Sequence, residues 1–163
     1  MKKIKLPFII LVILLSACKQ QPEKQPVDLE AEKAALNALI GKFEAVTNTD
    51  TLASFLTEDA LVTGTAPSEL WNKQQMVEMW TQYYSSMVPE HSYMGERTVK
   101  VAADGNSATV IEEYIMPVMS PVLPARNTLH LVRINAKWMI DFISICFIPE
   151  NEDIPKINEV LSE

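Results

Sequence analysis

An aspartate and a histidine in two neighbouring apolar segments are the residues of this sequence best suited to chemistry. Asp141 lies in the run 137–148, the most apolar predicted strand, where strand parity groups it with Ile143 and Ile145. Loss of surrounding water raises the pKa of a carboxyl group, which suits a general base or a neutral donor. His130 lies in the preceding predicted strand, so the two side chains can meet and share a proton. We take Asp141 and His130 as the candidate catalytic pair; the alternative, that hydrogen bonds satisfy each in the core or at the surface, stays open.

A second group of polar side chains is suited to line a ligand pocket. Glu69 and Trp71 precede a predicted helix, where exposed amide donors gather and a polar rim is natural. A simpler interpretation is that Trp71 packs the loop and Glu69 caps it locally. Further candidates supply polar tips inside apolar segments, either in a cavity or as core residues with satisfied hydroxyls. They are Tyr83, Tyr84, Glu112 and Tyr114.

Other chemistries find little support in the sequence. His91 and His130 lack the ligand spacing of a zinc site. Met116 and Met119 have a spacing that copper(I) can use, but no His or Cys stands nearby in the sequence. The sequence contains no Gly-rich phosphate loop and no nucleophile elbow. We therefore expect neither a metal nor a cofactor.

Residues 1–17 have the pattern of a lipoprotein signal peptide. Three lysines precede the apolar run Leu6–Leu15, which is too short for a comfortable membrane span. The run ends in Leu15-Ser16-Ala17-Cys18, which resembles the bacterial lipobox, whose Cys receives a diacylglyceryl group. Each buried CH₂ of such chains contributes about 0.8 kcal/mol to membrane binding. We expect lipidation of Cys18 and a location in the cell envelope, in the outer membrane or on the outer face of the inner membrane; an uncleaved anchor or an ordinary secreted protein is the alternative.

Residues 18–27 are polar and are predicted to be a flexible tether between the lipid and a folded domain. Removal of the signal peptide takes away three lysines and no acidic residue, so the formal charge falls from −7 to −10. This acidity disfavours binding to nucleic acid or to anionic lipid headgroups. Lipidation of Cys18 leaves Cys146 without a disulfide partner, and its apolar neighbours predict a buried, inert thiol.

Residues 28–163 have the length of one domain, with helices first and strands later. Helical spacing and capping residues predict a long helix after Asp28, a short helix around Leu52 and a third helix after Asn72. Pro155 favours a short terminal helix. Alternating patterns predict strands at 60–65, 91–101, 107–116, 127–134 and 137–148, with turns at 104–106 and 135–136. Three prolines predict a loop rather than a strand at 116–124, and its apolar content suggests that it covers something.

A short motif and the order of the elements together resemble a known superfamily. The segment 64–71, GTAPSELW, is similar to the GT-x-P-x-E-x-W segment of one SnoaL-like branch, and Trp138 with Ser144 is similar to that branch's last strand. Asn72 stands where a glycine is common, and a histidine often seen near the last strand's Ser is absent. The resemblance, over about residues 28–148, is to the nuclear transport factor 2-like (NTF2-like) superfamily. It implies an α+β, cystatin-like domain: a cone-shaped, curved antiparallel sheet wrapped around a long N-terminal helix, with a mostly apolar pocket.

Function follows less directly than fold from this resemblance. Some relatives are isomerases, dehydratases or cyclases and many others only bind ligands or partners, so the resemblance implies no catalytic residue in this chain. We expect a domain that binds a small apolar or amphipathic ligand without turnover. Two alternatives stay open: an isomerase or dehydratase that uses Asp141 and His130, and an envelope protein-interaction module. A homodimer formed through the outer face of the sheet is a further option.

Overall fold

The computed structural model describes residues 27–86 and 92–162, with the side chains of residues 84–86 excepted. The expected signal peptide, Cys18 and most of the tether therefore lie outside the described residues, as does His91. The helices are α1 (Leu29–Glu44), α2 (Thr49–Ala53), α3 (Lys73–Ser86) and α4 (Ile154–Leu161). The strands are β1 (Leu56–Thr63), β2 (Leu70–Asn72), β3 (Ser92–Tyr93), β4 (Thr98–Val101), β5 (Ser107–Met116), β6 (Ser120–Ile134) and β7 (Lys137–Phe147).

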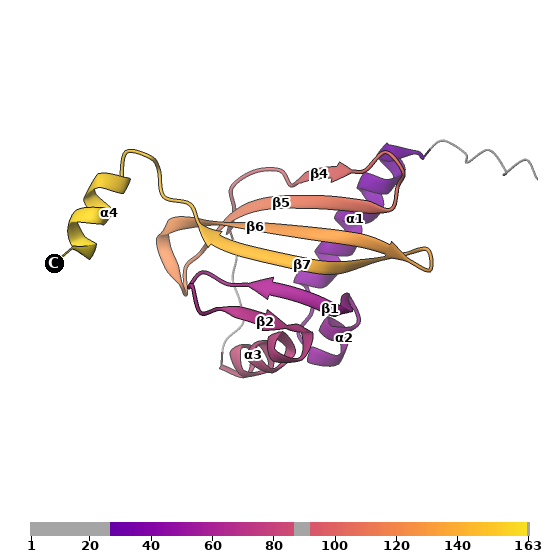
Figure 1. The fold of residues 1–163 in the computed structure, drawn as a ribbon, viewed down its shortest axis with the longest axis horizontal. Coiled ribbons are helices and arrows are strands. Elements are labelled where there is room, and N and C mark those ends of the chain that lie inside the picture. Colours follow the sequence, from indigo (N-terminus) through magenta and orange to yellow (C-terminus); the bar gives the residue numbers. More distant parts are fainter. Residues whose placement is uncertain (1–26, 87–91, 163) are drawn as a thin grey trace, which may run out of the picture.

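Helix α1 begins where the sequence predicts it. The Asp28 side chain accepts a hydrogen bond from the Ala31 amide at 3.1 Å, which satisfies one free donor of the first turn. The predicted apolar stripe is buried: Leu36 and Ile40 are fully inaccessible and Phe43 nearly so. The helix crosses one face of the sheet (Figure 1) and supplies one side of the core.

Helix α3 also begins at its predicted cap, through a reciprocal pair of hydrogen bonds. The Asn72 side chain accepts from the Gln75 amide and the Gln75 side chain accepts from the Asn72 amide, each at 3.0 Å. This capping box satisfies two donors at once, and its Asn occupies the position where relatives often have a glycine. The first residue of α3 directly follows the last residue of β2, so the start of the helix is fixed to the edge strand of the sheet.

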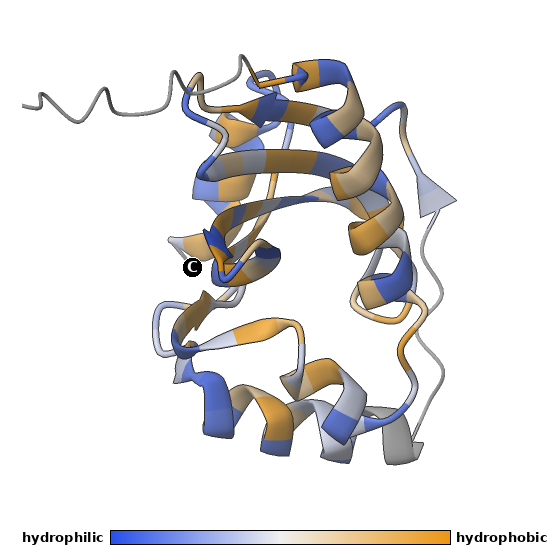
Figure 2. Cartoon of the chain, turned by 90° about the vertical axis from the view of Figure 1, so that its right-hand side faces the viewer, coloured by the Kyte–Doolittle hydropathy of each residue, from blue (hydrophilic) through white to orange (hydrophobic). Residues whose placement is uncertain are grey.

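The sheet has the strand order β2-β1-β7-β6-β5-β3, with β4 also paired to β5. Neighbouring strands are antiparallel except for β1 and β7, which run parallel. The sheet is curved and does not close into a barrel, and α1 and α3 lie against it at different places (Figures 1 and 2). This confirms the predicted α+β class and the curved sheet around the first helix.

The two predicted hairpin turns are present. Asn135 and Ala136 both have positive φ, 50° and 63°, which gives the tight connection between β6 and β7 the twist that adjacent strands need. Gly105, with φ 69°, lies in the turn between β4 and β5.

The strand boundaries need four corrections. Strand β1 spans Leu56–Thr63, whereas the prediction was 60–65. The segment before α3 contains the short strand β2, which pairs with β1 and was predicted as loop. The predicted strand region 91–101 is split into β3 and β4. Strand β6 starts at Ser120, so the predicted loop shrinks to 117–119. The prolines of β6 are tolerated because Ser120 pairs with Met116 and the next pair on β5 joins Ala125 to Tyr114, leaving 121–124 outside the β5 ladder.

The two faces of the sheet differ in their cover. Inner positions such as Val110, Leu129 and Ile140 are fully buried against α1 and its neighbours. Outer positions of β5, β6 and β7 alternate with these and are mostly half-buried, because none of the described helices packs over them. Cys146 belongs to this outer face and is exposed, so the prediction of a buried thiol is wrong. A strand that is central in the sheet need not be covered on both faces.

Candidate functional site

A cavity of about 310 Å³ lies inside the domain, between the inner face of the sheet and the helices α1 and α3. Its walls are mainly apolar: α3 contributes Met76, Met79 and Trp80, and β7 contributes Ile143 and Ile145. The hairpin between β5 and β6 adds methionine side chains to the wall, which agrees with the expectation that the proline-rich segment covers something. The cavity has the size and lining of a small-molecule site.

One end of the cavity is polar and holds two carboxylates joined by an arginine. Glu112 on β5 is 4% exposed. The Arg97 guanidinium donates to Glu112 Oε2 at 2.8 Å and to Glu44 Oε1 at 2.6 Å. Asn127 on β6 donates from Nδ2 to Glu112 Oε1 at 2.9 Å. Glu44, Glu112 and Asn127 line the cavity, whereas Arg97 is not among its lining residues.

The charge at this end of the cavity is unusual. Burial first, and then the hydrogen bond and repulsion with Glu112, together raise the pKa of Glu44 to about 7, against the attraction of Arg97. The pKa of Tyr93 is also raised, first by burial and then by the nearby charges of Glu44 and Glu112. Glu44 therefore changes its protonation state near neutral pH, while Arg97 stays charged.

Glu69 and Trp71 line the cavity near β2, and their geometry explains the GTAPSELW segment. Glu69 Oε2 accepts a hydrogen bond from the Ala66 amide at 2.8 Å, so this carboxylate also holds its own loop together. A Cβ atom on Gly64 would lie 2.8 Å from Trp71 Cη2 and 2.9 Å from Glu69 Cβ, and would clash with Glu69 Oε2. Gly64 is thus needed for close approach. Glu69 both lines the cavity and holds its own loop, and a role in ligand binding stays a prediction.

Two of the three tyrosine candidates line the cavity, and the side chain of the third lies outside the described ones. Tyr83 and Tyr114 line the cavity, and the Tyr83 hydroxyl donates to Met116 Sδ at 3.8 Å. Burial raises the pKa of both tyrosines, so their hydroxyls stay neutral donors. Tyr84 lies on α3, but its side chain is outside the described ones.

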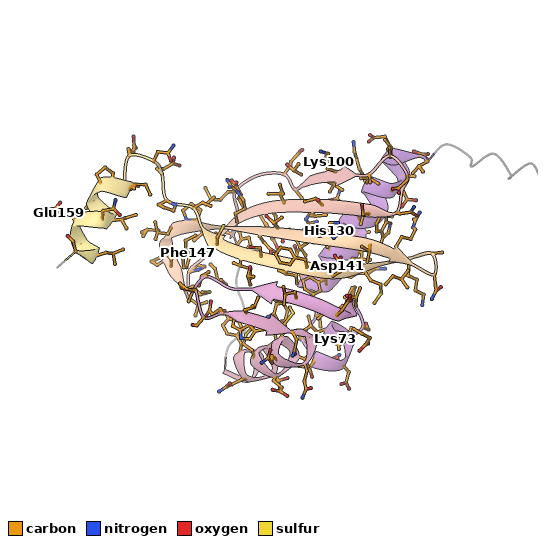
Figure 3. All side chains as sticks on the ribbon, in the orientation of Figure 1. Lys73, Lys100, His130, Asp141, Phe147 and Glu159 are labelled. Carbon is orange, nitrogen blue, oxygen red and sulfur yellow. The ribbon has the colours of Figure 1, made fainter. Side chains whose placement is uncertain are left out.

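Asp141 and His130 meet, but on the other face of the sheet. His130 Nδ1 lies 2.7 Å from Asp141 Oδ1, and their side chains are 40% and 29% exposed. They come from the adjacent strands β6 and β7, as labelled in Figure 3, and neither lines the cavity. A register shift in this ladder pairs His130 with Phe142 and Leu131 with Ile140. Asp141 is the extra residue, and this bulge reverses the parity of β7, so the predicted grouping of Asp141 with Ile143 is wrong.

A separate polar cluster fixes the N-terminal part of α1 to the sheet. The Glu32 carboxylate accepts from Arg133 at 2.6 and 2.7 Å and from the Trp138 indole at 2.9 Å. The hydrogen bonds from Arg133 and Trp138 lower the pKa of Glu32. Arg133 also lies over the Trp138 ring, 4.8 Å from its centre. Trp138, which contributed to the family resemblance, has this structural role.

Sequence reasoning missed three members of the polar end: Glu44, Arg97 and Asn127. Glu44 follows the buried stripe by four residues from Ile40, a spacing that could have placed it on the inner face. Arg97 lies in the irregular segment between β3 and β4, where no periodicity identifies a direction for its side chain. Over residues 27–86 and 92–162, no three His, Cys, Asp or Glu side chains gather as a metal site would need. In the same described part, no helix has the length and hydropathy to cross a membrane.

The fold and the cavity define the class of NTF2-like, cystatin-like proteins, and solved structures of that class superpose on the chain. An NTF2-like protein of unknown function from Pseudomonas putida KT2440 has a TM-score of 0.61 at 12% identity, over 76% of this chain and 91% of that one. An NTF2-like protein with a cystatin-like fold from Novosphingobium aromaticivorans has a TM-score of 0.59 at 14% identity, over 78% and 89%. A candidate ketosteroid isomerase from Parabacteroides distasonis ATCC 8503 has a TM-score of 0.54 at 16% identity, over 71% and 86%.

A family model gives the more specific result. The model of the SnoaL-like domain matches residues 33–147, so the chain belongs to the SnoaL-like domain family. No curated protein matches the chain. The structural likeness, at these low identities, concerns the fold alone.

Proposed function

We propose that this protein binds a small apolar or amphipathic ligand in the cavity, without turnover. The observation that carries the proposal is the cavity itself: about 310 Å³, enclosed by methionine, isoleucine and aromatic side chains, with polar groups confined mainly to one end and to the rim. Such a lining binds the apolar body of a ligand through burial and orients it through a few hydrogen bonds. The SnoaL-like fold is compatible both with ligand binding and with catalysis, so the choice between them has to rest on the residues of the site.

The test is to fill the cavity from one wall. Replacing Met79, which lines the cavity from α3, by tryptophan adds an aromatic ring to the space a ligand would occupy. We expect at least a tenfold loss of affinity for a neutral fluorescent probe such as Nile red. Gln74→Trp, at an exposed position of the same helix, is the matched control and should bind as the unaltered chain does. Equal binding by Met79→Trp and Gln74→Trp would refute a ligand site in the cavity.

We further propose that the domain works while attached to the cell envelope by lipid at Cys18. The support is the sequence pattern of residues 1–18, a basic start and an apolar run that ends in Leu-Ser-Ala-Cys. A tethered binding domain would hold its ligand close to the membrane surface, in the outer membrane or at the outer face of the inner one.

An isomerase or dehydratase activity is the second hypothesis, and Asp141 with His130 is its candidate pair. The 2.7 Å contact between their side chains gives the proton-sharing arrangement that the hypothesis requires. Since neither residue lines the cavity, the reaction would have to take place on the outer face of the sheet. His130→Ala and Asp141→Asn should then each abolish turnover without a large change in melting temperature. Turnover that survives both substitutions would exclude this pair.

A role in protein interaction, including a homodimer, has its own support on the outer face of the sheet. Leu61 on β1 is 40% exposed and is paired in register with Phe142 on β7, so apolar groups lie together there. Burying them against a partner would be favourable. Leu61→Glu should separate a dimer held by this face. A monomeric mass for the unaltered chain in analytical ultracentrifugation at micromolar concentration would count against self-association.

A further inference from the structure

The polar end of the cavity offers acceptors of hydrogen bonds and negative charge to a ligand, with no basic group among the described lining residues. Three carboxylates line the cavity, those of Glu44, Glu69 and Glu112. Arg97 offsets one of these charges, but it contacts Glu44 and Glu112 without being part of the lining. An anionic ligand would therefore be repelled where a polar ligand group has to be placed.

The Asn127 side chain offers a further acceptor, which also favours a ligand that donates hydrogen bonds. Asn127 is 8% exposed and lines the cavity, and its Nδ2 is already committed to Glu112. Its Oδ1 is buried and has no hydrogen-bond partner among the described residues. A buried acceptor without a donor is costly, so a ligand that donates a hydrogen bond there would gain stability from it. Glu112 itself has both oxygens occupied, by Arg97 and by Asn127.

Aromatic faces form much of the remaining wall. Rings within such a lining attract cations through their negative faces, most strongly where water is excluded. The aromatic lining residues are Phe43, Trp71, Trp80, Tyr83, Tyr93 and Tyr114. Phe43 and Trp80 lie next to each other, with ring centres 5.7 Å apart. Phe43 directly precedes Glu44 in α1, which places aromatic and acidic groups at the same part of the wall.

We infer that the cavity selects an organic ammonium ion with an apolar body, held by the Glu44 carboxylate, the Asn127 amide oxygen and the aromatic wall, with the negative charge of Glu112 beside them. This inference rests on the proposed ligand-binding function and names the chemical class of the ligand. An ammonium group donates hydrogen bonds and accepts none, so it matches a site whose free groups are acceptors. Its positive charge also takes the place of the proton on Glu44.

The competition with a proton gives a directional pH effect. Glu44 is faced by Glu112 and Tyr114 from β5, Tyr93 from β3 and the Arg97 guanidinium, and its pKa of about 7 results from burial and the Glu112 charge against Arg97. Below that pKa the ligand must displace a proton, so affinity for an ammonium ion rises as pH increases through about 7 and then levels off. A neutral ligand has no charge to attract the ionised carboxylate and does not take the place of the proton.

The experiment compares three probes with one apolar body, by isothermal titration calorimetry on the folded chain. They are 2-(1-naphthyl)ethylamine, 2-(1-naphthyl)ethanol and 1-naphthylacetate, which are cationic, neutral and anionic from pH 5.5 to 8.5. At pH 8 we expect the amine to bind at least about tenfold tighter than the alcohol and the acid least. Only the amine should bind more tightly as pH rises, and near pH 7 its binding should release protons, measurable in buffers of different ionisation enthalpy.

Two variants tie the preference to the carboxylates. Glu44→Gln should reduce the affinity for the amine at pH 8 to near the affinity of the same variant for the alcohol, and should remove the pH dependence of amine binding. Glu113→Gln, next to Glu112 but on the half-exposed outer face, is the control and should keep the preference. Equal binding of amine and alcohol, or an amine preference that survives Glu44→Gln, overturns the inference but leaves the proposed binding function standing. Failure of all three probes to bind at millimolar concentration counts against both.

Discussion

Replacing Glu44 by glutamine measures what the charge at the polar end of the cavity costs the fold. A folded-state pKa of about 7, against an ordinary value of 4.5, corresponds at 1.36 kcal/mol per unit to at most about 3 kcal/mol. The Glu44 side chain keeps 22% of its exposure, so water screens part of this cost, and we expect about 1–2 kcal/mol.

The sign of the effect follows from proton binding. Between pH 4.5 and about 7 the folded chain holds a proton on Glu44 that the unfolded chain has lost, so stability falls as pH rises through this window. Glutamine has no proton to lose. Glu44→Gln should therefore match the original chain near pH 4.5 and exceed its free energy of unfolding by about 1–2 kcal/mol at pH 8, or roughly 2–4 °C in melting temperature per kcal/mol.

Urea unfolding at pH 4.5, 6 and 8, followed by tryptophan fluorescence, measures the difference between the two chains, in which all other titrating groups cancel. Glu30→Gln, on the same helix in an exposed pair with Lys33, is the control and should show little change from pH 6 to 8. A Glu44→Gln chain that is less stable than the original at pH 8 would refute the reasoning, because the ionised Glu44–Arg97 pair would then be net stabilising.

Three further predictions test other parts of the chain. Glu32→Gln should lower the free energy of unfolding by about 1–2 kcal/mol at pH 7, since it weakens charge-assisted hydrogen bonds. Because the pKa of Glu32 is lowered, this difference should shrink as pH falls below 4.5. A difference that stays constant when stability is measured at decreasing pH would contradict this prediction. Gly64→Ala should destabilise the domain by about 1–3 kcal/mol, because the added Cβ clashes with Glu69 and Trp71. Gly41→Ala has open space around it in α1 and should stabilise the domain by about 0.5–1 kcal/mol. Thermal unfolding of both variants measures the two effects. Cys18→Ser should move the protein from the membrane to the soluble fraction and abolish labelling by a radioactive or clickable fatty acid; unchanged membrane association would exclude the lipid anchor.

The helices were predictable because their signals are local. Asp28 and Asn72 were identified as caps, and the stripe of α1 was identified by spacing, since these interactions join residues three or four apart. The family resemblance added the curved sheet, which local patterns alone would not have given. The short strand β2 was not predicted, because the pattern of three residues is too short to distinguish a strand from a loop.

The candidate site was only partly predictable, because side-chain direction depends on long-range register. The contact between His130 and Asp141 followed from the adjacency of their strands, but the bulge at Asp141 turned that carboxyl away from the face of Ile143. Arg97 meets Glu44 and Glu112 across 53 and 15 residues of sequence, and nothing in its own segment indicates that contact. Whether the pair on the outer face has any catalytic role stays a prediction.

The parallel pairing of β1 with β7 affects when the domain can fold. Strand β1 has one local neighbour, β2, and its other neighbour is the last strand of the sheet. Leu61 is paired with Phe142, so the sheet cannot be completed until nearly the whole chain has been synthesised. Such distant contacts slow folding, because a long loop must close before they form. An emerging chain therefore cannot complete this sheet until its last strand has been synthesised.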